Sequence, residues 1–172
     1  MRKSTDRGRF AIGAAVLAAA TVVALPTNHA FARGDGWLPL PFAPYDAACG
    51  TTTVHVSAPV NREFYLETTL ADGTVQWHVT GSLDLNYATD DGKSITVNSS
   101  GPGHLLTFPN ADVQVLAKGR NSFTFTPEQA ETLGVPQISV SAGPFDVTFH
   151  PDGTVSGHLG NIIRDVCAEL TA

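Results

Sequence analysis

The sequence predicts a small all-β domain, and three observations lead to this prediction. Apolar and polar residues alternate in about ten short segments after Cys49, which is the pattern of strands with one buried and one solvated face. Asp-Gly pairs separate such segments at 72–73, 91–92 and 152–153, and Asp-Gly tolerates the positive φ angles of tight hairpin turns. The two cysteines, Cys49 and Cys167, stand near the two ends of the alternating region.

The Asp-Gly turns predict three antiparallel hairpins. The expected pairs are 63–70 with 74–80, 82–88 with 93–99, and 144–150 with 154–159. Successive hairpins favour a meander, and a disulfide between its first and last strands favours closure of the meander on itself. The expected fold is therefore a small antiparallel meander barrel of about 8–10 strands, with a two-sheet sandwich as the alternative.

One segment departs from the alternating pattern and predicts a short helix. Thr126 is a suitable helix cap, Pro127 suits the first helical position, and Gln129 completes a capping box. Gly134 suits the end of such a helix. We expect about two helical turns here, crossing between two strands.

The first 32 residues have the features of a secretory signal peptide. Basic residues precede an apolar run over 10–25, and Pro26 and the small residues Ala30 and Ala32 follow it. This order directs export, with cleavage after Ala32. A transmembrane anchor is the weaker alternative, because a spanning helix needs roughly 20 apolar residues. The expected mature protein is residues 33–172, secreted and without a membrane span.

The mature chain divides into an arm, residues 33–48, and a single β domain, residues 49–172. The arm is rich in proline and aromatic residues. Because proline cannot donate to a ladder, Pro39, Pro41 and Pro44 argue against a place for the arm in a sheet. Its aromatic side chains either pack on the domain, which is the favoured interpretation, or remain exposed and bind a partner.

The charge of the mature chain limits its partners. Without residues 1–32 the sequence holds 6 basic and 15 acidic residues, a net charge of −9. This surplus repels phosphate groups, so it argues against nucleic acid and anionic membrane surfaces as partners. With these two classes excluded, the expected partner is an extracellular ligand or protein, whose kind the composition does not specify.

Export and the even cysteine count predict a disulfide between Cys49 and Cys167. Cys49 is expected just before the first strand and Cys167 in the last one. The bridge would close a loop of more than a hundred residues, for which chain entropy predicts about 4–5 kcal/mol of stabilisation. It also requires the two ends of the β domain to lie close together.

The histidines do not have the spacing of a known metal site, and neither a metal nor a cofactor is expected. His55, His78 and His158 fall on the polar phase of their strands, which usually faces water. In a barrel with a polar lumen the same phase would line a cavity. The candidate pocket of that second interpretation comprises Trp77, His78, Tyr87 and His158.

Catalytic motifs do not emerge from the sequence, and no catalytic residue is predicted. Glu63 and Glu67 lie on one strand roughly 13 Å apart, whereas paired glycosidase carboxylates need roughly 5–9.5 Å, so a solvated face is the favoured interpretation. The mature chain has neither a G-x-S-x-G elbow nor an S-x-x-K motif.

Several segments resemble a family of small exported actinobacterial proteins that has no assigned function. The resemblance covers most of the mature chain and rests on segments 49–52, 60–63, 72–74, 79–83, 92–103 and 165–168, from the Cys-Gly-Thr-Thr start to the Asp-Val-Cys-Ala end. It implies secretion and a β fold, and it brings no catalytic or binding residues.

These observations leave three hypotheses for function. The favoured one is a secreted, non-enzymatic module that binds a ligand, a polymer or a protein. The alternatives are a small secreted hydrolase or isomerase with its site in a barrel mouth, and a structural protein of the cell envelope. A pocket with titratable groups of shifted pKa would favour the enzyme, whereas an exposed aromatic patch built from the arm would favour binding.

Overall fold

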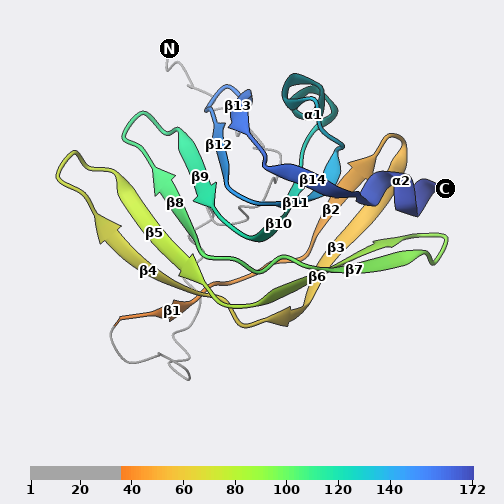
Figure 1. Cartoon of the computed structure of the whole chain (residues 1–172), viewed down its shortest axis with the longest axis horizontal. Helices are drawn as coiled ribbons and strands as arrows, with labels where there is room; N and C mark the ends of the chain where they lie inside the picture. Colours follow the sequence, from red (N-terminus) through yellow and green to blue (C-terminus); the bar gives the residue numbers. More distant parts are fainter. Residues whose placement is uncertain (1–35) are drawn as a thin grey trace, which may run out of the picture.

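Fourteen strands and two short helices make up residues 36–172, the part of the chain that the computed structural model describes (Figure 1). The predicted all-β class is confirmed. The predicted signal peptide, residues 1–32, lies outside the described residues, as do the first residues of the predicted arm.

All strand pairs are antiparallel, and they form three sheets. The seven-stranded sheet has the order β1 (Leu38–Pro39), β4 (Phe64–Thr69), β5 (Val75–Thr80), β8 (Gly103–Thr107), β9 (Val113–Ala117), β12 (Phe145–Phe149), β13 (Val155–His158). The four-stranded sheet has the order β2 (Tyr45–Cys49), β3 (Thr52–Asn61), β6 (Leu83–Thr89), β7 (Ser94–Asn98). The three-stranded sheet has the order β10 (Arg120–Thr124), β11 (Ile138–Ala142), β14 (Asn161–Asp165).

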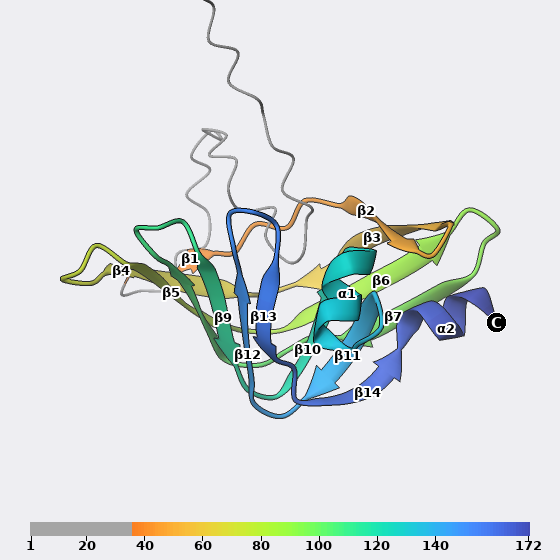
Figure 2. The same cartoon turned by 90° about the horizontal axis from the view of Figure 1, so that it is seen from above.

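The sheets are connected by sharp corners rather than by long loops. Strand pairs such as β3–β4, β5–β6 and β9–β10 follow each other after only two residues, and the chain passes from one sheet into another at each corner (Figures 1 and 2). At the β5–β6 corner, a Cβ on Gly81 would lie 2.2 Å from the carbonyl oxygen of Arg62. Glycine is therefore required where two backbones come this close.

All three predicted hairpins are confirmed. They are β4–β5, β6–β7 and β12–β13, and each turns at its Asp-Gly pair. In the first, the Asp72 carboxylate accepts a hydrogen bond from the Thr74 amide at 2.9 Å, and Gly73 has a φ of +86°. The local turn chemistry therefore decided these pairings, as the sequence indicates.

The described strands form a sandwich-like arrangement and do not close into a barrel. The meander barrel, which was the favoured prediction, is therefore wrong. The sandwich alternative is the one observed, with three sheets instead of two. The strand number exceeds the expected 8–10 in part because the arm, which was not expected to enter a sheet, contributes β1 and β2.

Two apolar clusters form the core. The first lies between the four-stranded and three-stranded sheets, includes Val54, Tyr87 and Ile138, and is closed by Val166 of helix α2 (Val166–Thr171). The second includes Phe123, Phe125, Phe145 and Val147, and helix α1 (Pro127–Leu133) packs on it through Ala130 and Leu133.

Helix α1 confirms the predicted helix in detail. The Thr126 hydroxyl accepts from the Gln129 amide at 3.2 Å, and the Gln129 side chain accepts from the Thr126 amide at 3.1 Å, which completes the capping box. Gly134 ends the helix with a φ of +66°. The second helix, α2, was not expected, because residues 162–167 read as a strand.

The arm is part of the β structure, contrary to the expectation from its prolines. Leu38 and Pro39 form the edge strand β1 beside β4, and the second arm strand, β2, begins at Tyr45. An edge strand tolerates proline because the missing N–H falls where no partner strand is needed. The arm aromatics pack on the domain, with Phe42 against the first core cluster and Trp37 against His78 at 5.3 Å.

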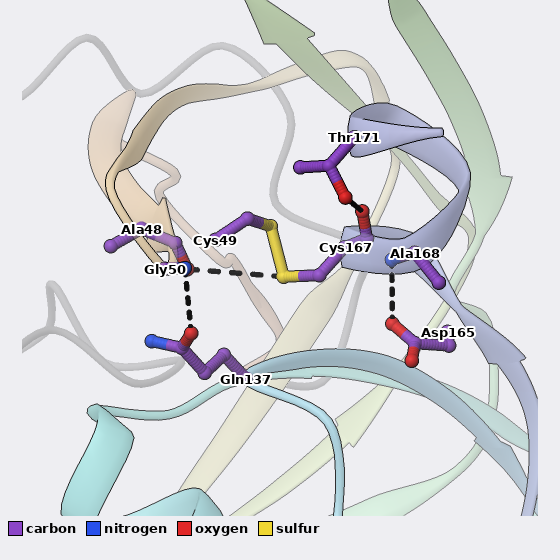
Figure 3. The surroundings of a disulfide bond; sticks show 8 residues. All are labelled: Ala48, Cys49, Gly50, Gln137, Asp165, Cys167, Ala168 and Thr171. Atoms are coloured by element: carbon purple, nitrogen blue, oxygen red, sulfur yellow. Dashed lines mark hydrogen bonds between the residues drawn. A yellow bond between two sulfur atoms is a disulfide. The ribbon is translucent and has the colours of Figure 1, made fainter.

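The predicted disulfide joins Cys49 and Cys167, whose Cα atoms are 5.2 Å apart (Figure 3). Cys49 is the last residue of β2, and Cys167 lies in α2 rather than in a strand. Asp165 caps this helix by accepting from the Ala168 amide at 2.9 Å. The bridge therefore fastens the C-terminal helix to the first strand of the four-stranded sheet.

Candidate ligand-binding cavity

Strands of all three sheets line one cavity of about 150 Å³ near the corners. The wall is mainly apolar and includes Phe42, Trp77, Val79, Leu105, Val115 and Phe145. Gly103 of β8 stands directly opposite Ala117 of β9, and a Cβ on Gly103 would lie only 2.9 Å from that of Ala117. Ala117 lines the cavity, so a larger side chain at this position would take up part of its space.

Residues 40–43 and Tyr45 of the arm form one side of this cavity. Two hydrogen bonds hold this segment in place: the Leu40 amide donates to the Glu63 carbonyl at 2.9 Å, and the Asn61 side chain donates to the Leu40 carbonyl at 2.8 Å. The arm thus covers the cavity and contributes apolar surface to it through Phe42.

The carboxyl group of Glu63 is the notable polar group of the cavity. Glu63 lies at the corner between β3 and β4 and is only 9% exposed. Burial away from water raises its pKa to about 7, because desolvation disfavours the charged form. Within residues 36–172, no side chain donates a hydrogen bond to this carboxyl group.

The Asn121 side chain lines the same cavity and also has an unused donor. Its Nδ2 atom is buried without a hydrogen-bond partner among the described residues. The nearby hydroxyls are occupied: the Ser99 oxygen accepts from the Ser122 amide at 2.9 Å, and the Ser122 hydroxyl donates to the Ser139 carbonyl at 3.1 Å. An acid and an amide are therefore left to contact a ligand.

The four residues of the candidate pocket do not come together. Trp77 lies on the cavity wall, where its indole donates to Glu67 at 2.7 Å and its ring contacts Tyr65. Tyr87 is fully buried in the first core cluster, with its hydroxyl 2.7 Å from that of Ser122, and burial raises its pKa.

His78 and His158 lie away from the cavity. His78 alternates with Trp77 along β5, so its ring is on the opposite face of the sheet, where it stacks on His104 at 4.8 Å. His158 is exposed on the edge strand β13. The polar phase of these strands therefore faces outward.

Sequence reasoning missed Glu63, which it placed on a solvated face with Glu67. In the structure Glu67, within β4, is exposed, whereas Glu63, the residue before β4, is buried. The difference arises at the corner, where the arm and the second layer of strands cover Glu63. The alternation pattern contains no signal for this burial.

Neither a metal centre nor a membrane span is evident in residues 36–172. In this part of the chain, groups of three or more His, Cys, Asp or Glu side chains do not gather in a way that could hold a metal ion. Its helices are too short to cross a membrane.

Comparisons do not place the chain in a known group. No family model, curated protein or solved structure matches it. The resemblance to exported actinobacterial proteins therefore stays a prediction.

Proposed function

We propose that the protein is a secreted, non-enzymatic binding module that takes a small, mainly apolar ligand into the cavity between its sheets. The observation that carries this proposal is the cavity itself, which combines an apolar wall with the buried carboxyl group of Glu63 and the unpaired amide donor of Asn121. Pockets for small ligands usually have this composition, in which a few polar groups orient the ligand and apolar surface supplies affinity.

The size of the cavity suits a small ring or a short alkyl group. An engineered apolar cavity of about 150 Å³ in another protein stays dry and binds benzene. Burial of a ligand's apolar surface contributes about 25 cal/mol per Å². A larger ligand would place one apolar end in the cavity and leave the rest outside.

Calorimetric titration with benzene, phenol and benzylamine tests this proposal, with tryptophan fluorescence, to which Trp77 of the cavity wall contributes, as a second measurement. Ala117→Leu fills the cavity and should weaken binding at least tenfold, while Ala168→Leu, an exposed position on α2, should not. Circular dichroism checks that both variants fold. The proposal fails if the wild type binds none of these probes or if Ala117→Leu binds them unchanged.

Acid–base catalysis by Glu63 is the second candidate, because a pKa of about 7 suits proton transfer near neutral pH. A hydrolase or isomerase would need Glu63 for turnover as well as for binding. A panel of nitrophenyl esters and glycosides tests this candidate. Turnover that disappears in Glu63→Gln, while the variant still binds the substrate, would favour the enzyme.

Secretion is part of the same proposal. The Cys49–Cys167 bridge fits an oxidising compartment outside the cytosol. Mass spectrometry of the exported protein should find a first residue at Arg33 and a mass lower by two hydrogens than that of the reduced chain.

A further inference from the structure

We propose that the natural ligand of the cavity is an organic cation, an amine or quaternary ammonium whose carbon substituents fill the apolar space while its charge lies against Glu63. This inference rests on the proposed binding function and adds the chemical class of the ligand. It follows from the charges and rings that line the cavity.

The cavity lacks a positive partner for Glu63. Of the described residues that line it, none is lysine or arginine. His104 is among them, but its ring lies on the other face of the sheet against His78 and its Nδ1 is 3.0 Å from the Gln76 amide. An ionised Glu63 is therefore a buried charge without compensation, which a bound cation would supply.

The other titratable side chain on the cavity wall does not supply a charge. The Tyr45 hydroxyl lies 3.1 Å from that of Thr124, and burial raises its pKa above the usual value of 10. Tyr45 is therefore neutral at physiological pH. Glu63 is the group that sets the charge of the cavity.

Aromatic rings favour the same ligand class. Phe42, Tyr45, Trp77, Phe123 and Phe145 all belong to the wall. The faces of such rings attract cations, most strongly where water is excluded. The net charge of −9 over residues 33–172 attracts cations to the molecule as well.

Cation binding should be linked to the loss of one proton. A cation requires the ionised form of Glu63, which is the minor form below a pH of about 7. The apparent affinity should therefore rise about tenfold between pH 6 and pH 8 for a permanent cation. Glu63→Gln should remove this pH dependence, whereas Glu131→Gln, which makes the same charge change at an exposed position of α1, should retain it.

Choline and its uncharged carbon isostere, dimethylbutanol, are the matched probes, and tetramethylammonium is a third. Isothermal titration in buffers of different ionisation enthalpy measures affinity and proton release together. We expect choline to bind the wild type and Glu131→Gln at least tenfold more tightly than the isostere at pH 8. In Glu63→Gln this preference should vanish, and urea unfolding of the variant checks that it is folded.

The outcomes separate this inference from the function on which it rests. Equal affinity for choline and the isostere, or cation binding that survives unchanged in Glu63→Gln, overturns the cation proposal and leaves apolar binding in place. Failure of all three probes together with the aromatic probes overturns both.

Discussion

Burial without a counter-charge distinguishes Glu63 from the other acidic residues of the described chain. Most of those residues lie on the surface, and the pKa values of Asp72 and Asp152 are lowered by hydrogen bonds within their turns. Glu63 has the opposite shift because it faces an apolar cavity. A buried carboxyl group with a strongly raised pKa destabilises the folded protein. Such a group at a cavity is a candidate for function, because perturbed pKa values cluster at functional sites.

Replacement of Glu63 by glutamine should therefore stabilise the protein at high pH. The pKa rises from 4.5 to about 7 on folding, so the folded state keeps a proton that the unfolded state has lost in this window, and stability falls as the pH rises. We expect Glu63→Gln to raise the free energy of unfolding by about 2–3 kcal/mol at pH 8 and to have little effect at pH 4.5. Urea unfolding at both pH values measures this difference, and an equal effect at both would contradict it.

His55 lies on the surface, where its environment favours the charged form of the side chain instead of disfavouring it. Its two ring nitrogens lie 2.7 Å from Asp46 and 2.8 Å from Asp90, and these hydrogen bonds raise its pKa above 6.5. The stabilisation is complete below the unfolded pKa and is lost as the pH rises through the raised folded value. Asp90→Asn should lower the pKa of His55 in an NMR titration, whereas Asp84→Asn should not change it. An unchanged pKa in Asp90→Asn would show that this contact is absent in solution.

At the scale of elements, the corners decide how strands are shared among sheets. Gly81 combines a φ of +139° with a backbone approach that leaves no room for a Cβ. Ser82 and Arg62 exchange backbone hydrogen bonds across the same corner, at 2.8 and 3.5 Å. Glu63 directly follows Arg62 in the chain. The geometry of this corner therefore also determines where the Glu63 carboxyl group lies.

Gly81→Ala should destabilise the protein by about 2–4 kcal/mol, because the added methyl forces the two backbones apart. Gly92→Ala is the matched control: its φ is +88°, but a Cβ there meets no atom within 4 Å. The control should lose only about 1–2 kcal/mol through its backbone conformation. Chemical unfolding of both variants gives the difference, and equal losses would mean that the close approach at Gly81 relaxes without cost.

At the scale of the whole molecule, the disulfide connects residues that are 118 positions apart. It fixes α2 to β2 and so closes the first core cluster, to which Cys49, Val166 and Leu170 belong. In the chain-entropy account, a bridge over so long a loop reduces the entropy of the unfolded chain more than a bridge over a short one.

Reduction of the disulfide should lower the free energy of unfolding by about 4–5 kcal/mol. Guanidinium unfolding with and without reductant measures this loss. The double variant Cys49→Ala/Cys167→Ala should show a similar loss without reductant and no response to it. A midpoint that stays the same after complete reduction would contradict the role given to the bridge.

The sequence by itself determined the local elements and one long-range link. Asp-Gly turns specify the three hairpins, and the Thr126–Gln129 capping box specifies α1. The predicted export together with the two cysteines indicated the disulfide. Each of these features depends on a few neighbouring residues or on a single available partner. Tertiary structure alone decided the rest: the corners, the place of β1 in a sheet, the cavity and the burial of Glu63. These features depend on which distant segments cover one another, and residue alternation is the same on a covered face and on an open one.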